Sequence, residues 1–253
     1  MASLLVDLHM HTVLSPCAEI EMIPPLIVQR ALDLRLDVIA ITDHHCAANV
    51  QAVMAAAEGT RLVVLPGMEV QTREEVHMLC LFDTLNQVSA WQEAVFAALP
   101  DRPNNPEFFG EQYVVDSTGG YLYTETRLLS VSTSLSVEQV VQGVNERGGV
   151  CLPAHVDRPA YSLLSNLGFI PAELAIAGVE ISHLTTPRKI VQLFPQLSRY
   201  GIIANGDAHR LDEMITRTRV RVEKPTVAEL GLALARQGGR SVDVTEHPPF
   251  VVS

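Results

Sequence analysis

Short apolar runs alternate with longer amphipathic segments along most of this 253-residue chain. The first two runs, 4–8 and 38–42, enclose a segment at 24–36 that begins with two prolines and whose apolar residues recur with helical spacing. Strands that alternate with helices are typical of βαβ units and a mostly parallel sheet. About seven such strands over this length fit a closed or nearly closed (β/α) barrel, and an open doubly wound sheet is the alternative.

The other predicted strands are equally short and lie at 62–65, 76–82, 150–152, 178–181 and 202–205. Helices are predicted at 47–58, 87–99, 137–146, 187–200 and 226–237. Ser136 is expected to cap the third of these helices, and Pro195 to kink or split the fourth. The stretch 84–135, between the fourth and fifth strands, is expected to be an insertion that acts as a lid and helps to select the substrate.

The charge balance is strongly acidic. Lys and Arg total 18 and Asp and Glu total 29, which gives a formal net charge of −11. Because duplex binding depends on basic residues that neutralise phosphates, no long duplex nucleic acid is expected as a partner. A small phosphorylated substrate is compatible with this charge if bound cations hold it.

The chain contains no apolar stretch long enough to span a bilayer and no basic segment at its start, so neither a membrane partner nor a secretory signal is expected. Its four cysteines form no CxxC pair. A reduced, cytoplasmic protein is the simplest interpretation. The sequence gives no indication of an oligomeric state.

Histidines and acids gather where the predicted strands end. Seven of the nine histidines follow or end such strands: His9, His11, His44, His45, His155, His183 and His209. In a parallel barrel all strand ends open on one face, where active sites are built. Each motif alone is a weak signal, but so many polar strand ends are hard to explain by stability, because buried polar groups cost free energy unless paired. Neutral imidazole together with carboxylate suits Zn, Mn or Fe.

Five of these segments resemble, in order, the motifs of the PHP (polymerase and histidinol phosphatase) family. They are DLHMHT at 7–12, TDH at 42–44, GME at 67–69, AH at 154–155 and GDAH at 206–209. The resemblance covers most of the chain. It implies an α/β fold, a distorted (β/α)7 TIM-like barrel over residues 1–253, and phosphoester hydrolysis with two or three divalent metal ions.

The resemblance also implies which side chains hold these ions: His9, His11 and Asp207 for the first, His77 and His155 for the second with Glu69 bridging the two, and His44 and His209 for the third. His77 enters only through the resemblance, since its place at the head of a strand suggests an ordinary strand residue.

The chain departs from the family pattern after the His-x-His pair. Many members place an Asp or His there for the third ion, whereas this chain reads SPCAEIE at 15–21. Glu19 or Glu21 could replace that acid, and Cys17 could bind as a thiolate. Counting back from Pro24 slightly favours Glu19, and all three could instead belong to a solvated loop.

The expected activity is metal-dependent hydrolysis of a phosphoester in a small metabolite or nucleotide, by a water activated at the C-terminal rim of the barrel. Arg158 is expected to contact the phosphate because a guanidinium can hold two oxygens, although a surface ion pair is equally compatible with its position. Arg210 is a weaker candidate for the same contact.

Two histidines remain outside the ligand scheme. His45 or His183 could protonate the leaving oxygen, or each could have a structural role. Asp43 and Glu180 are expected to orient neighbouring imidazoles.

Three other functions compete with this one. A metal-dependent amidohydrolase often uses a carbamylated lysine at a strand end, but the two lysines, Lys189 and Lys224, fall in a predicted helix and a loop. A non-catalytic metal- or ligand-binding module would keep the histidines without turnover. A nuclease acting on oligonucleotide ends would need only a short stretch of nucleic acid.

Overall fold

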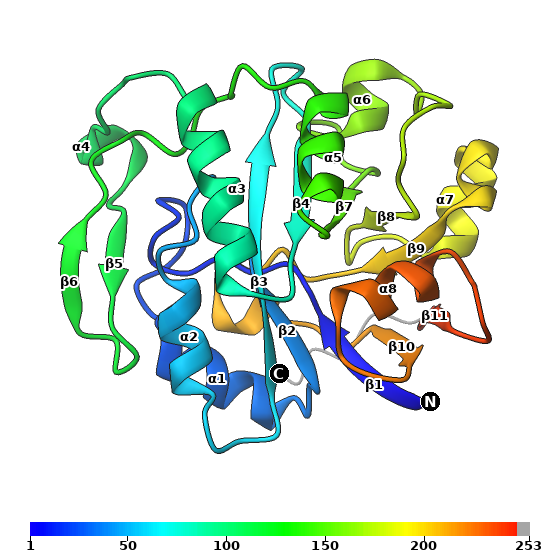
Figure 1. Cartoon of the computed structure of the whole chain (residues 1–253), viewed down its shortest axis with the longest axis horizontal. Coiled ribbons are helices and arrows are strands. Elements are labelled where there is room, and N and C mark those ends of the chain that lie inside the picture. Colours follow the sequence, from blue (N-terminus) through cyan, green and yellow to red (C-terminus); the bar gives the residue numbers. More distant parts are fainter. Residues whose placement is uncertain (247–253) are drawn as a thin grey trace.

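The computed structural model describes residues 1–246 and has a mixed α/β architecture built on a curled, seven-stranded sheet (Figure 1). The order of strands in this sheet is β11-β10-β1-β2-β3-β4-β7. Their bounds are β1 (Ala2–Asp7), β2 (Val38–Ile41), β3 (Val63–Gln71), β4 (His77–Leu81), β7 (Val150–Pro153), β10 (Thr218–Val222) and β11 (Ser241–Val244). The α/β class expected from the alternating pattern is therefore confirmed.

The large sheet is mixed, so the expectation of a mostly parallel sheet is wrong for it. β1, β2 and β3 are parallel, whereas β4 is antiparallel to both β3 and β7, and β10 is antiparallel to β1 and β11. Only residues 72–76 separate β3 from β4. A connection this short cannot cross over a sheet, so the chain must turn back as a hairpin.

A second, two-stranded parallel sheet consists of β8 (Gly178–Ile181) and β9 (Gly201–Ala204). β8 contacts β7 and β9 contacts β11, so the small sheet lies between the two edges of the large one. The ends of β1, β2, β3, β7 and β9 then open on a common rim.

The helices begin where the sequence supplies starting signals. Their bounds are α1 (Pro24–Asp33), α2 (Val50–Ala56), α3 (Leu85–Ala98), α4 (Pro106–Phe109), α5 (Val137–Glu146), α6 (Leu163–Leu167), α7 (Pro187–Leu193) and α8 (Val227–Leu234). Ser136 forms a capping box with Gln139, and a 3₁₀ turn begins at Pro195 where α7 has ended, as predicted for both. Within residues 1–246 no helix has the length and apolar character that crossing a bilayer requires.

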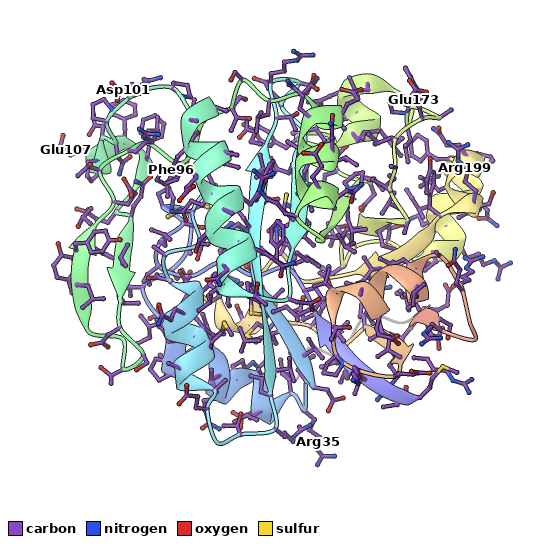
Figure 2. All side chains as sticks on the ribbon, viewed as in Figure 1. Arg35, Phe96, Asp101, Glu107, Glu173 and Arg199 are labelled. Carbon is purple, nitrogen blue, oxygen red and sulfur yellow. The ribbon has the colours of Figure 1, made fainter. Side chains whose placement is uncertain are left out.

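The segment 84–135 holds α3, α4 and a hairpin of β5 (Tyr113–Val115) and β6 (Tyr121–Thr124). α3 belongs to the core, because its Trp91 is buried there, while Asp101 and Glu107 lie at the outer edge of the molecule (Figure 2). Asn49, at the start of α2, makes two hydrogen bonds with β5. Its side-chain Nδ2 donates to the carbonyl of Tyr113, and its Oδ1 accepts from the backbone N–H of Val115. Part of this segment is thus structural framework.

The indole of Trp91, on α3, packs directly on Gly143 of α5. A Cβ atom at Gly143 would lie 2.5 Å from Cζ3 of Trp91, whose side chain is only 2% exposed. Because a buried indole cannot move aside without displacing the core, the contact requires glycine.

We therefore expect Gly143→Ala to lower the free energy of unfolding by about 1–3 kcal/mol, although alanine favours helices more than glycine. Urea denaturation monitored by circular dichroism measures this change. Gly231→Ala is the matched control, since Gly231 also lies inside a helix and its added Cβ would meet only Val150 Cγ2 at 3.3 Å. Equal effects of the two substitutions would contradict the packing argument.

Candidate metal centre

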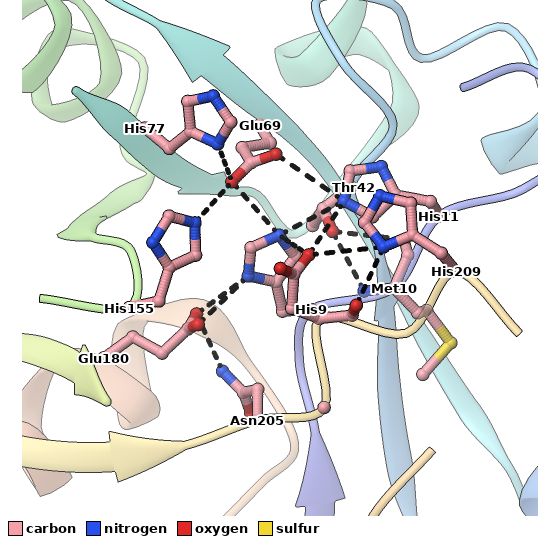
Figure 3. Close-up of polar contacts among 12 residues, drawn as sticks. His9, Met10, His11, Thr42, Glu69, His77, His155, Glu180, Asn205 and His209 are labelled. Carbon is pink, nitrogen blue, oxygen red and sulfur yellow. Dashed lines mark hydrogen bonds and ion pairs between the residues drawn. The ribbon is translucent and has the colours of Figure 1, made fainter. Parts of the chain in front are cut away.

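Six strand-terminal segments meet at the rim, and their imidazoles and carboxylates point toward one another (Figure 3). His9 and His11 follow β1 in an extended stretch, where alternate side chains face the same side. A bridge between Met10 and Ala208 joins this stretch to the segment after β9. That bridge brings Asp207 beside the two histidines.

His77 reaches the rim because β4 runs against its neighbours. The β3–β4 register places His77 opposite Gln71, and Leu79 opposite Glu69. Residues opposite one another in an antiparallel pair share a face, so His77 and Glu69 lie diagonally on the same face. The start of an antiparallel strand thus lies where parallel strands end, so a pattern of polar residues at strand ends alone does not include His77.

The carboxylate of Glu69 lies at the centre of the cluster and is 1% exposed. Five imidazole nitrogens surround it: His77 Nδ1 at 2.9 Å, His9 Nε2 at 3.3 Å and His155 Nε2 at 3.4 Å from Oε1, and His44 Nδ1 at 3.0 Å and His11 Nε2 at 3.5 Å from Oε2. Neither oxygen has a hydrogen-bond partner among residues 1–246. Buried polar atoms without a partner call for an ion or water that satisfies them.

The most enclosed group consists of His9, His11, Glu69 and Asp207, which are all buried and offer ligand atoms within 4.8 Å of one another. Asp207 Oδ1 lies 3.1 Å from His9 Nε2 and 3.2 Å from His11 Nε2. Two imidazoles and two carboxylates form the donor set expected for Zn, Mn or Fe.

The outer nitrogens of the first two histidines are occupied by acceptors. His9 Nδ1 lies 3.0 Å from a Glu180 oxygen, so Glu180 orients a neighbouring imidazole as expected. His11 Nδ1 lies 2.8 Å from Ser15 Oγ, and Ser15 donates its own proton to Asp43, so Asp43 acts through Ser15. When both rings are neutral, each directs an Nε2 lone pair inward, and these two atoms are 3.3 Å apart. Facing lone pairs repel unless a cation lies between them.

The two carboxylates of this group remain ionised. Burial alone would raise the pKa of Glu69, but the charges of His77 and His9 hold it well below its usual value. Burial also opposes ionisation of Asp207, whose pKa is nevertheless lowered, first by His9 and then by a hydrogen bond from His11. The group therefore supplies negative charge for a cation.

A second group shares Glu69 with the first. His44, Glu69 and His77 offer ligand atoms within 4.8 Å of one another, and His155 lies against the same carboxylate oxygen as His77. Gln71 Oε1 lies 3.4 Å from the outer Nε2 of His77. The structure therefore brings together the side chains expected around a second ion. His44, which was expected at the third ion, also lies in this group.

A third group consists of His11, His44 and His209. Cys17 lies beside it, with Sγ 3.4 Å from His44 Nε2. Burial would raise the pKa of Cys17, but hydrogen bonds with His209 and His44 lower it to about 6. Cys17 thus lies next to the histidines that the resemblance gives to a third ion.

Glu19 and Glu21 do not lie in the cluster. Both are exposed, and the nearest cation to the Glu19 carboxylate is Arg210 Nε at 3.8 Å. The backbone of Glu19 donates to the carbonyl of His209, which turns its side chain outward. Arg210 in turn pairs with the surface acids Glu19, Asp212 and Glu213 and is not part of the cavity wall.

A cavity of about 390 Å³ opens above the cluster, and Arg158 and Tyr161 form part of its wall. Arg158 Nη1 donates to Asp207 Oδ2, the carboxylate oxygen that faces away from His9 and His11. Arg158 therefore fixes a ligand while its remaining donors stay beside the cavity.

His45 and His183 lie outside the wall of this cavity. His45 is fully buried, and burial followed by the charge of His44 lowers its pKa to about 3. His183 follows β8, and its carbonyl accepts a hydrogen bond from the buried Arg217. Neither imidazole is in place to give a proton to a substrate in the cavity.

Backbone strain concentrates at the rim. Of the seven non-glycine residues with positive φ in the described part of the chain, four lie there: His45 (56°), His155 (30°), Tyr161 (56°) and Asp207 (50°). Such conformations cost of order 1–3 kcal/mol each and persist only where the surroundings enforce them. The fold thus holds these residues at the rim in backbone conformations that they would otherwise avoid.

A comparison with family models matches the PHP domain to residues 7–157, which is more than half of the chain. The chain belongs to the PHP domain family. The resemblance of its motifs is confirmed, and the buried histidines and carboxylates at the rim form groups that could hold metal ions. No curated protein matches it in sequence.

Several solved structures share its fold. The lesion-specific endonuclease Q of Pyrococcus furiosus is 20% identical with a TM-score of 0.72, and the match covers 95% of this chain and 58% of the endonuclease. A proposed metal-dependent phosphoesterase of Bifidobacterium adolescentis is 21% identical over 87% of this chain and 89% of that protein, with a TM-score of 0.56. An amidohydrolase of Chromobacterium violaceum is 21% identical over 83% and 89%, with a TM-score of 0.55. The chain thus spans little more than half the length of endonuclease Q.

The expectation that excluded long duplex nucleic acid is wrong. An endonuclease Q complex of the same fold, with a TM-score of 0.68 and 20% identity over 95% of this chain and 58% of that one, holds a 27-mer duplex with an abasic lesion at its active site. Net charge describes the whole surface, whereas a ligand responds to the potential at one site, so an acidic total does not exclude duplex nucleic acid.

We expect Glu180→Gln to weaken binding of the first ion about 10–100-fold, because Glu180 fixes the orientation and tautomer of His9. Competition with a chromogenic chelator measures the affinity. Glu58→Gln, on the exposed surface, is the control and leaves the affinity unchanged. An unchanged affinity in Glu180→Gln would remove the positioning role.

Metal binding is also expected to release a proton from His9. Burial would lower the pKa of His9, but Glu180 and Asp207 raise it well above its usual value, so the metal-free ring is charged at pH 7. The charged ring contributes to the free energy of unfolding. This contribution is fully present below pH ~6.5 and is lost as the pH rises through the raised pKa. A bound ion needs the neutral ring and must displace about one proton.

Calorimetric titration of metal-free protein with Zn²⁺ at pH 7, in two buffers of different ionisation enthalpy, measures this release. The apparent enthalpy should differ between buffers in the wild type and differ less in His9→Asn. Identical enthalpies for the wild type in both buffers would contradict a charged His9.

Proposed function

We propose that this chain is a metal-dependent hydrolase of phosphoesters that uses two or three divalent ions of Zn, Mn or Fe at the rim of the curled sheet. The observation that carries the proposal is the Glu69 carboxylate, which is buried, lacks a hydrogen-bond partner among the described residues and faces five imidazole nitrogens.

The spacing of the donor atoms fits metal ions. Bonds of about 2.0–2.1 Å in a tetrahedral site put ligand atoms about 3.3 Å apart. The contacts among His9, His11, Glu69 and Asp207 run from 3.1 to 3.5 Å. These four residues would hold the first ion, and His77 and His155 would share Glu69 around the second.

When bound, such ions supply Lewis acidity to the phosphoryl oxygens and to the attacking water. The chain contributes orientation: Glu180 and Ser15 hold the first two imidazoles in one tautomer, and Arg158 holds Asp207. The donors of Arg158 that Asp207 does not occupy are available to a phosphoryl oxygen at the cavity wall.

The substrate class that fits best is a phosphate ester with at least one small group beside the phosphorus, such as a phosphorylated metabolite or a nucleotide. A cavity of about 390 Å³ suits a group of that size. A phosphodiester within nucleic acid is the second candidate, because an endonuclease Q of the same fold takes its substrate as duplex DNA.

Amide hydrolysis is supported less well. The fold is shared with an amidohydrolase, but Lys189 lies in α7 and Lys224 follows β10, so neither lines the cavity. We also propose that the strands form the distorted (β/α)7 barrel of the family, with β8 and β9 completing the wall between β7 and β11.

The test is a panel of substrates assayed with Mn²⁺ or Zn²⁺: an aryl phosphomonoester, an aryl phosphodiester, a duplex oligonucleotide with and without an abasic site, and an N-acyl amide. Phosphoester turnover is expected, with a loss of at least about 100-fold in Glu69→Gln and His155→Ala, each of which must stay folded by circular dichroism. Turnover of the amide alone, or full activity in both variants, would reject the proposal.

A further inference from the structure

A sulfur atom lies at the third group of ligands, where the family pattern has an acid or a histidine. Cys17 Sγ lies 3.4 Å from His44 Nε2, and His44 and His209 offer ligand atoms within 4.8 Å of each other. The three residues come from the loop after β1, the end of β2 and the loop after β9. Cys17 is exposed, so this position is open to ions from solvent.

The two imidazoles can both direct an Nε2 lone pair toward the sulfur. His209 Nδ1 lies 2.9 Å from the carbonyl oxygen of Asp207, which can only accept, so this nitrogen carries the proton. His44 Nδ1 lies 3.0 Å from the Glu69 carboxylate without hydrogen-bond geometry, and the negative charge of this carboxylate favours the proton on the nitrogen nearest to it. The Nε2 atoms of both rings are then left as ligands.

Neither acid of the loop 15–21 is in place to compete as an oxygen ligand at this position. The carboxylates of Glu19 and Glu21 point outward, and His11 Nε2 lies within 3.2 Å of Asp207, in the first group. The donor set at the third position is therefore one sulfur and two nitrogens. The first group instead offers two nitrogens and two carboxylates.

We propose that Cys17, as a thiolate, forms the third metal centre together with His44 and His209, and that this centre is selective for Zn²⁺, Co²⁺ or Fe²⁺ over Mn²⁺ and Mg²⁺. Thiolate is a soft ligand that binds the former ions strongly, whereas carboxylate and water suit the latter. The inference rests on the metal cluster of the proposed function and does not depend on the substrate.

Titration of metal-free protein with Co²⁺ tests this assignment without turnover. A thiolate-to-cobalt charge-transfer absorption should appear in the near ultraviolet with one of the bound ions. Cys17→Ser should abolish the absorption and weaken one ion about tenfold or more. Mn²⁺ in excess should not displace that ion.

Two variants serve as matched controls. Glu19→Gln removes the competing acid in the same loop, and Cys151→Ala removes a thiol buried in β7. Both should keep the absorption at full intensity. Loss of the absorption in Glu19→Gln, or its persistence in Cys17→Ser, would overturn the assignment.

A measurement on the wild-type protein guards against misfolding of Cys17→Ser. Alkylation of Cys17 by iodoacetamide, followed by peptide mass spectrometry, should slow at least about tenfold on addition of Zn²⁺, because a bound thiolate is not free to react. An unchanged rate at saturating Zn²⁺ would also overturn the assignment. Because neither readout involves hydrolysis, failure here remains distinct from failure of the substrate panel.

Discussion

The burial of the Glu69 carboxylate is the constraint on which the rest of the rim depends. A buried charge of this kind destabilises a fold unless opposite charges surround it closely. Here the segments after β1, β2 and β7 and the start of β4 bring imidazoles to within 3.5 Å of the two oxygens. The hydrogen-bonding partners farther out, such as Glu180 held by Asn205, keep those rings in one orientation. Removal of a single member therefore disturbs all the others.

Much of this arrangement could be predicted from the sequence because it follows from local patterns. The His9-x-His11 spacing, the TDH and GDAH segments and the helix starts at Pro24 and Ser136 lie where expected. These features depend on the alternation of side chains along a strand and on capping chemistry, and both act over a few residues.

The remainder depended on contacts that no local pattern contains. Strand direction decided the role of His77, because its place at the head of β4 reaches the rim only in a hairpin. Glu19 lies outside the cluster, and its backbone N–H donates to the carbonyl of His209, a residue far along the chain. The prediction from net charge that duplex DNA is not a partner was wrong for a similar reason. A sum over all residues does not say where on the surface the charges lie.

The β3–β4 hairpin has a consequence for how this centre can vary among related chains. Glu69 and His77 share a face because the turn at 72–76 fixes their pairing, and side chains along a strand alternate between faces. A turn longer or shorter by one residue that shifted the register of β4 by one position would turn each of its side chains to the opposite face, and His77 would point away from the ions. Changes of two residues would preserve it. The length of an exposed turn that touches no metal thereby restricts which insertions the family can accept at this point.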